Sequence, residues 1–222
     1  MKRLFDLESP LMSGLIKLFD CICLSVLWLV CCIPLVTAGA ASAALYTTVF
    51  KYIRREEGTL AATYFGAFKE NFRRSTLAGL VSLALLAVLV LDALVFRSLR
   101  LSGSAMGSFY GASLVLIGIA LTWMIYLAAY SARFNGSVRD VLRWSFVLMV
   151  IHPLRALEVF AVLAAGVVLA LSLPFVALIA PAGIFWCASI LIEKVFLLHL
   201  RPEDAEAEAA RQEDDQQGGN AK

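Results

Sequence analysis

Charged residues are scarce in this chain. Of its 222 residues, 16% are Asp, Glu, Lys or Arg, against about a quarter in a typical soluble domain. Hydrophobic residues make up 61% and fall in long runs rather than being spread evenly. Runs of about 18 or more such residues predict transmembrane helices. The composition therefore favours a membrane protein over a soluble domain, with a lipid bilayer as its surroundings and no nucleic acid as a partner.

Residues that carry out catalysis or bind metals are also few. The two histidines, His152 and His199, have no partner at helical spacing, and none of the five cysteines belongs to a Cys-x-x-Cys pair. The sequence has no His-Glu-x-x-His, Gly-x-Ser-x-Gly, Walker or dinucleotide-binding motif. The cysteines lie in apolar runs, so we expect small buried side chains rather than metal ligands or disulfides. We expect no catalytic residue, metal or cofactor, and no enzyme.

The first uncharged run is too long for one membrane-spanning helix. It covers thirty residues, 21–50, which as a helix would extend about 45 Å across a hydrocarbon core of about 30 Å. Pro34 lies inside it, and proline disfavours helical backbone in the residue before it. We therefore predict two helices, at 14–33 and 38–55, joined by a tight turn at 34–37.

Three positions around this turn are candidates for a special role. Pro34 forms the turn, and Thr37 is placed to cap the start of the second helix. Gly39 belongs to a run of small residues, 38–44, that allows close approach of a neighbouring helix. We expect the two helices of the turn to pack antiparallel through this small-residue face. The second helix is either a packing helix or a re-entrant or mobile element that lines a cavity.

The rest of the chain predicts further spans. Another long run must fold back at Pro174 and Pro181. Together these runs predict an all-α transmembrane bundle of about six spans, with five as the alternative. The bundle forms one domain, 1–200, followed by an acidic tail, 201–222, which is expected to be disordered. The additional spans lie near 75–96, 109–132, 156–173 and 182–199.

Two shorter segments have the pattern of helices that lie in the membrane interface. Segments 60–74 and 138–151 each carry an apolar stripe opposite basic residues. The connections at 51–74 and 133–143 hold six and three basic residues. Because basic connections stay in the cytoplasm, six spans place both termini in the cytoplasm as well, and a multi-pass protein of the cytoplasmic membrane is expected.

Acidic residues within the predicted spans are the remaining polar candidates. Asp20 lies early in the first span and three residues after Lys17, and Asp92 lies near the end of the third. Ionisable groups in a bilayer are costly and often functional. Either acid could anchor a helix end, Asp20 by pairing with Lys17 and Asp92 by pairing with Arg97 or facing water, or could act on a substrate or proton. Glu193 is interpreted as a pair with the adjacent lysine.

Three blocks of the first third resemble the YesL family of bacterial integral membrane proteins. They are LFDLESPLMSGLIKLFD, LWLVCCIPLVTAGAASAALY and FGAFKENFRRST, in the family's order and spacing across residues 4–76. Ser25 departs from the asparagine expected in many relatives. The resemblance implies a polytopic protein of unestablished activity. Such proteins are often encoded beside systems for carbohydrate uptake and polysaccharide degradation.

Three functional hypotheses follow. The first is a non-enzymatic accessory protein for carbohydrate uptake, with a sugar-uptake permease as its partner. The alternative is a small transporter or channel that acts alone, which would need polar residues converging near the middle of the bilayer. An intramembrane enzyme with an unrecognised motif is the third. The oligomeric state is left open by the sequence.

Overall fold

The computed structural model describes residues 10–54, 58–102, 105–134 and 136–198. Every regular element in this part of the chain is a helix, which confirms the predicted all-α class. The elements in chain order are α1 (Pro10–Cys32), the 3₁₀ turn η2 (Leu35–Thr37), α2 (Ala38–Thr48), the π-helical turn η3 (Val49–Arg54), α3 (Leu60–Leu101), the 3₁₀ turn η4 (Ala105–Phe109), α4 (Tyr110–Arg133), α5 (Val138–Ile151), α6 (Pro153–Ser172), α7 (Pro174–Ala177) and α8 (Ala180–Leu198).

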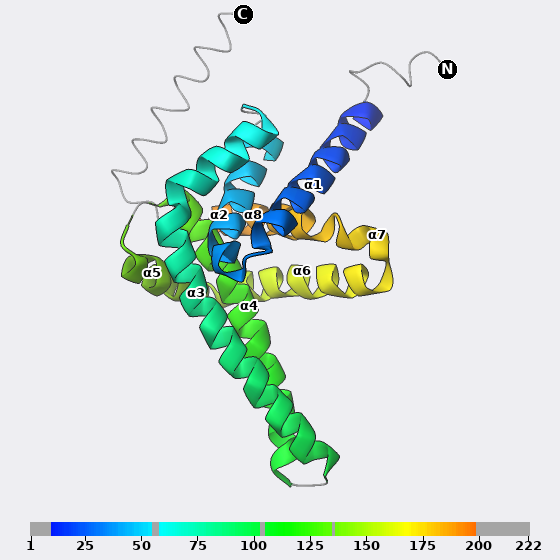
Figure 1. The fold of residues 1–222 in the computed structure, drawn as a ribbon, viewed down its shortest axis with the longest axis vertical. Coiled ribbons are helices and arrows are strands. Elements are labelled where there is room, and N and C mark those ends of the chain that lie inside the picture. The colour runs from blue at the N-terminus through cyan, green and yellow to red at the C-terminus, as the bar shows by residue number, and fades with distance from the viewer. Residues whose placement is uncertain (1–9, 55–57, 103–104, 135, 199–222) are drawn as a thin grey trace, which may run out of the picture.

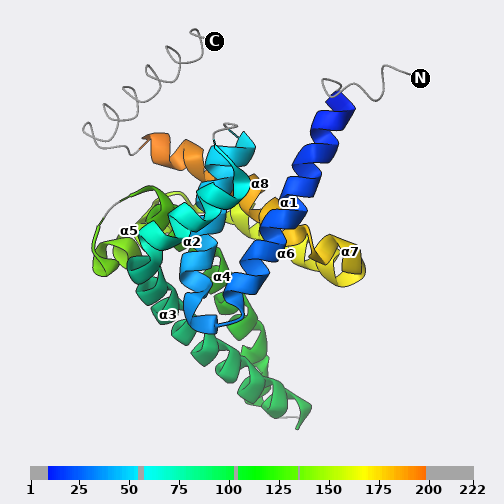
Figure 2. The ribbon, with the colours of Figure 1, turned by 45° about the horizontal axis from the view of Figure 1, so that its top comes forward.

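A long antiparallel hairpin of α3 and α4 dominates the shape. Its closed end extends well past the other helices, while α6 and α8 run across it in the same view (Figure 1). The second view shows the same hairpin with α2 lying against it (Figure 2). Helix α2 contacts α1, α3, α4 and α8, so it occupies the centre of the bundle.

The small side chains of α2 explain its central position. Eight of its eleven residues are buried, and half of these eight are alanine. Small side chains let neighbouring helices approach closely in the absence of bulky groups. The predicted helix at 38–55 is present over its described part as α2 followed directly by η3. The predicted packing role of this segment agrees with its burial.

The turn at Pro34 is present, but the role predicted for Thr37 is wrong. Its hydroxyl donates to the carbonyl oxygens of Cys31 at 2.5 Å and Pro34 at 2.8 Å, and it makes no cap bond to α2. Thr37 has helical backbone angles because η2 runs directly into α2, whereas an N-cap needs extended backbone. The side chain therefore bonds to a carbonyl in the last turn of α1 and to one in the turn itself, rather than to free amides of α2.

The separation of an interfacial helix at 60–74 from a span at 75–96 is also wrong. Both belong to α3, which is continuous over 42 residues and about 63 Å long. The segment holds no proline, and charged side chains do not interrupt a helix by themselves. The other interfacial prediction, 138–151, matches α5 in its bounds. A capping box at its start, formed by Ser137 and Asp140, fixes where α5 begins.

Four helical segments are long and apolar enough to cross a membrane, so a count of six spans is not confirmed. Helix α8 has a shorter apolar stretch, and α2 is only 11 residues long. The predicted fold-back is present: Pro174 begins α7, and Pro181 lies in the first turn of α8. The predicted tail, 201–222, lies outside the described residues. The four segments are Gly14–Cys32, Leu60–Leu101, Ala105–Arg133 and Pro153–Ser172.

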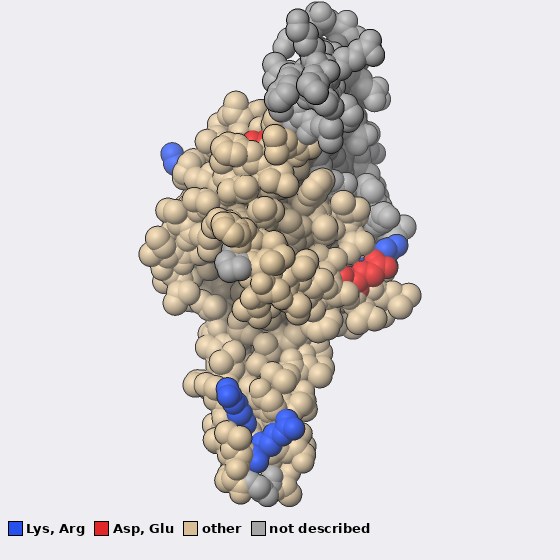
Figure 3. All heavy atoms as spheres, turned by 90° about the vertical axis from the view of Figure 1, so that its right-hand side faces the viewer, with Lys and Arg blue, Asp and Glu red and all other residues tan. Residues whose placement is uncertain are grey.

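The distribution of charge on the surface agrees with helices that cross a membrane. One face of the protein is almost free of charge across its broad middle, and basic side chains gather at the narrow end (Figure 3). Arg97 and Arg100, both exposed, lie in the last turns of α3 close to that end. Charges at the end of a long apolar hairpin fit helices that cross a hydrocarbon layer and emerge in water.

Candidate functional site

A buried ion pair joins helices α4 and α8. Glu193 of α8 is only 6% exposed, and its carboxylate accepts a hydrogen bond from the guanidinium of Arg133, the last residue of α4. The hydroxyl of Tyr46, on α2, donates to the other carboxylate oxygen at 3.1 Å. Three helices therefore meet at one carboxylate. Because a buried charge is costly without partners, this arrangement depends on all three side chains.

Aromatic rings surround the cation of this pair. The guanidinium carbon of Arg133 lies 5.4 Å from the ring centroid of Phe50 and 6.0 Å from that of Phe196. The ring of Phe134 packs edge-on against Phe196, with centroids 5.3 Å apart. Rings at these distances attract a cation through their negative faces. They also exclude water, which strengthens the attraction between Arg133 and Glu193.

A second arginine, Arg74, forms a hydrogen bond to the same end of α4. Arg74 of α3 donates to the carbonyl oxygen of Ser131 at 2.6 Å and to the side-chain oxygen of Asn71 at 2.5 Å. The last four carbonyl groups of a helix lack partners within the helix, and cations are favourable at that end. We call the six residues of these two groups the polar layer: Tyr46, Asn71, Arg74, Ser131, Arg133 and Glu193.

The two acids singled out from the sequence lie apart from the polar layer and from each other. Asp20 of α1 accepts a hydrogen bond from the hydroxyl of Tyr52, in η3, at 3.2 Å. Asp92 of α3 accepts one from the hydroxyl of Ser113, in α4, at 2.8 Å. Each acid thus joins two helices. Ser113 is a partner for Asp92 that spacing along the sequence did not indicate.

Gly39 lies where α2 and α3 approach each other too closely to leave room for a side chain. A Cβ atom added to Gly39 would be 2.2 Å from the carbonyl oxygen of Ser75 and 2.7 Å from the Cα of Gly79. A Cβ added to Gly79 would in turn be 2.5 Å from the Cα of Gly39. At Gly39 the small-residue run 38–44 therefore packs on α3, whereas its predicted contact with α1 lies elsewhere in the run. Helix α1 meets α2 at Ser42 instead, where the indole of Trp28 donates to the hydroxyl at 3.2 Å.

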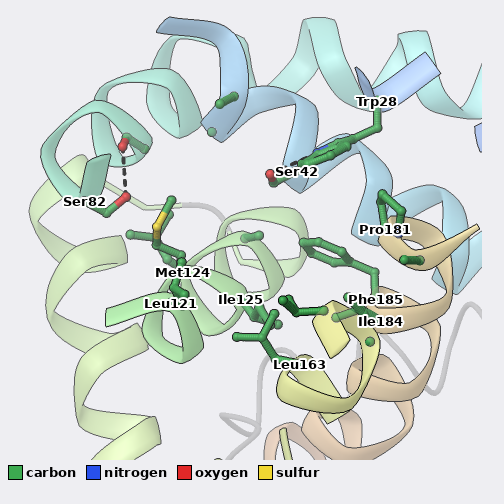
Figure 4. A pocket seen from close by; sticks show the side chains of 18 of the residues that line it. Trp28, Ser42, Ser82, Leu121, Met124, Ile125, Leu163, Pro181, Ile184 and Phe185 are labelled. Carbon is green, nitrogen blue, oxygen red and sulfur yellow. Dashed lines mark hydrogen bonds between the residues drawn. The ribbon is translucent and has the colours of Figure 1, made fainter. Parts of the chain in front are cut away.

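An apolar cavity of about 410 Å³ lies beside this glycine contact. Side chains from five helices point toward it: Trp28 from α1, Ser42 from α2, Met124 from α4, Leu163 from α6 and Phe185 from α8 (Figure 4). This volume falls within the range of about 300–1,000 Å³ that is common for ligand pockets. Of the five candidate positions predicted from the sequence, which are Asp20, Pro34, Thr37, Gly39 and Asp92, only Gly39 lines it.

The cavity has very few polar groups. Its polar side chains are Trp28, Ser42 and Ser82, and the first two bond to each other. The hydroxyl of Ser82 donates to the carbonyl oxygen of Gly79 at 2.8 Å, within the same helix. The cavity therefore has little capacity to bind a polar molecule, and it fits an apolar one.

The structure gives no sign of a metal centre in the residues that it describes. No group of three or more His, Cys, Asp or Glu side chains comes together there, and the five cysteines are free thiols. Three buried hydroxyls, of Ser75, Thr76 and Tyr126, have no hydrogen-bond partner among the described atoms. None of the three lines the cavity, so they add nothing to its polarity.

Fold and site together define the class: an all-helical protein whose apolar helices suit association with a lipid bilayer. A protein-family comparison then matches residues 21–93 to a family described as "Protein of unknown function, DUF624". The matched segment covers the second half of α1, all of α2 and most of α3, so it includes both glycines of the Gly39–Gly79 contact. The match agrees with a resemblance to an uncharacterised family in this part of the chain and does not confirm the name YesL. Neither a curated protein nor a solved structure matches the chain.

Proposed function

We propose that the protein is a non-enzymatic accessory protein of the bacterial cytoplasmic membrane that associates with a sugar-uptake permease. The observation that carries this proposal is the chemistry of the cavity, which offers a sugar only three polar side chains, two of them already bonded to each other. Sugar recognition needs many hydrogen bonds, because each hydroxyl group that loses water without a new partner lowers affinity. An accessory role fits this interior better than sugar transport.

The α3–α4 hairpin is the surface that supports association with a permease. Its outer part extends past the other helices (Figure 1). Large apolar side chains there are exposed, Val88 and Leu91 of α3 and Val115 of α4 each at 62%. Within a bilayer such a hairpin can pack along the transmembrane helices of another protein through van der Waals contact.

Photo-crosslinking in living bacteria tests the association. A photoreactive amino acid at Val88 or Leu91 is expected to crosslink to a membrane subunit of a sugar permease, identified by mass spectrometry. Val168 of α6, exposed to 61%, is the matched control on another helix. Crosslinks to lipid alone from both hairpin positions, or equal crosslinking of the permease from Val168, would contradict the proposal.

A small transporter acting alone is the second candidate, favoured by the buried Glu193. Ionisable groups within membrane proteins often belong to substrate or proton pathways. Under this alternative Glu193→Gln abolishes sugar flux through liposomes that contain only this protein. Under the accessory role there is no such flux to abolish.

A further inference from the structure

The apolar cavity has no function in the proposed association, and its walls indicate what it can hold. If it contained water, about a dozen molecules would fill 410 Å³, each requiring two to four polar partners. Three polar side chains line the cavity, and their hydrogen-bonding groups are largely used within the protein. Cavities of this kind stay dry and accept apolar molecules.

The position of the opening identifies the source of such a molecule. Two lining residues, Val167 of α6 and Ala177 of α7, are exposed, so the cavity opens beside them. Their neighbours on the same helices are large exposed apolar side chains, among them Leu171 at 82% and Phe175 at 85%. An opening with an apolar rim, beside a helix apolar enough to cross a membrane, faces hydrocarbon rather than water.

We infer that the cavity binds one acyl chain, which enters sideways from the bilayer past Val167 and Ala177. A methylene group occupies about the volume of a water molecule, so the space holds about a dozen methylenes of the chain. Lipid tails are already apolar, so shape and packing, rather than burial from water, decide whether the chain occupies the cavity. The chain belongs either to a phospholipid whose head group stays outside or to a free fatty acid.

Lipid retention measured by native mass spectrometry tests the inference. The protein is reconstituted in vesicles of dioleoyl-phosphatidylcholine, with or without added oleic acid, and then extracted in mild detergent. Ala170→Phe places a ring in the cavity from α6. Ala165→Phe, the matched control, makes the same change at an exposed position of the same helix that does not line the cavity.

We expect one dioleoyl-phosphatidylcholine or one oleate to remain on the wild type and on Ala165→Phe, and at least a tenfold lower retained fraction on Ala170→Phe. The mass of the retained molecule distinguishes the two sources of the chain. If Ala170→Phe does not fold, Leu163→Phe replaces it, with the exposed Leu169→Phe as its control. Absence of a retained lipid on the wild type, or equal retention by the lining and control variants, would overturn the inference.

Discussion

Replacing Glu193 by alanine removes the carboxylate at which α2, α4 and α8 meet. Arg133 then keeps a charge next to Phe50 and Phe196 without its buried counter-ion, and the hydroxyl of Tyr46 loses its acceptor. Removal of one partner from a buried pair costs about 3–5 kcal/mol, because the other charge is left uncompensated. We therefore expect the free energy of unfolding to fall by about that amount.

The chain contains its own control for this experiment. Arg155 and Glu158 form a second ion pair, in which the glutamate side chain is 46% exposed. An exposed pair contributes about 0–1 kcal/mol, so Glu158→Ala is expected to have little effect. Unfolding of both variants is measured by titration with sodium dodecyl sulfate in mixed micelles. Equal losses of stability at Glu193 and Glu158 would refute the reasoning about burial.

A double variant separates the charge from the packing. Replacement of a buried ion pair by apolar residues of similar size is often neutral or stabilising. Arg133→Met combined with Glu193→Leu should therefore regain most of the stability that Glu193→Ala loses. If the double variant is as unstable as the single one, the polar layer stabilises the fold through more than compensation of charge.

Three further predictions use the same structure. Gly39→Ala should lower the free energy of unfolding by about 1–3 kcal/mol through overpacking, and Gly39→Leu by more, which is measured as a lower melting temperature in detergent. The control is Gly66→Ala, where an added Cβ meets nothing within 4 Å, and its melting temperature should be no lower than that of the wild type. Asp92→Asn keeps an oxygen acceptor for its serine partner, so the free energy of unfolding should change by less than about 1 kcal/mol. If cells with this variant lose growth on the relevant carbohydrate while the protein stays at normal abundance in the membrane, an anchoring role is refuted. In a cysteine-free background, a cysteine introduced in place of Lys69 should be labelled from the cytoplasm and one in place of Ser98 from outside, since about 44 Å of helix separates the two positions. Labelling of both from the same side would contradict a membrane-spanning α3.

Proline positions made several helix boundaries predictable. Pro174 and Pro181 indicated the bend between α6 and α8, and Pro34 indicated the break after α1, because proline limits the backbone of its neighbours. The continuity of α3 was missed because this segment holds no proline, and the boundary was placed by charge instead. The basic residues near Arg74 were interpreted as a boundary, although Arg74 bonds within the bundle to Ser131 and Asn71.

The polar layer was missed because its contacts join residues far apart in the sequence. Glu193 was paired with its neighbour Lys194, but adjacent residues of a helix do not face each other. That geometry was a usable signal that Glu193 needed a partner elsewhere, though not that the partner was Arg133. Gly39 was identified correctly as a site of close approach, while its partner Gly79, forty residues later, required the fold.

Sugar flux in proteoliposomes tests the proposed accessory role most directly. Three sets of liposomes are compared. The first contains this protein alone, the second contains the permease identified by crosslinking alone, and the third contains both. Our account predicts that liposomes with this protein alone take up labelled sugar no faster than empty liposomes, and that the permease works faster or assembles in higher yield when this protein is present. Uptake by the protein alone, lost on Glu193→Gln, would contradict the accessory role and establish a transporter instead.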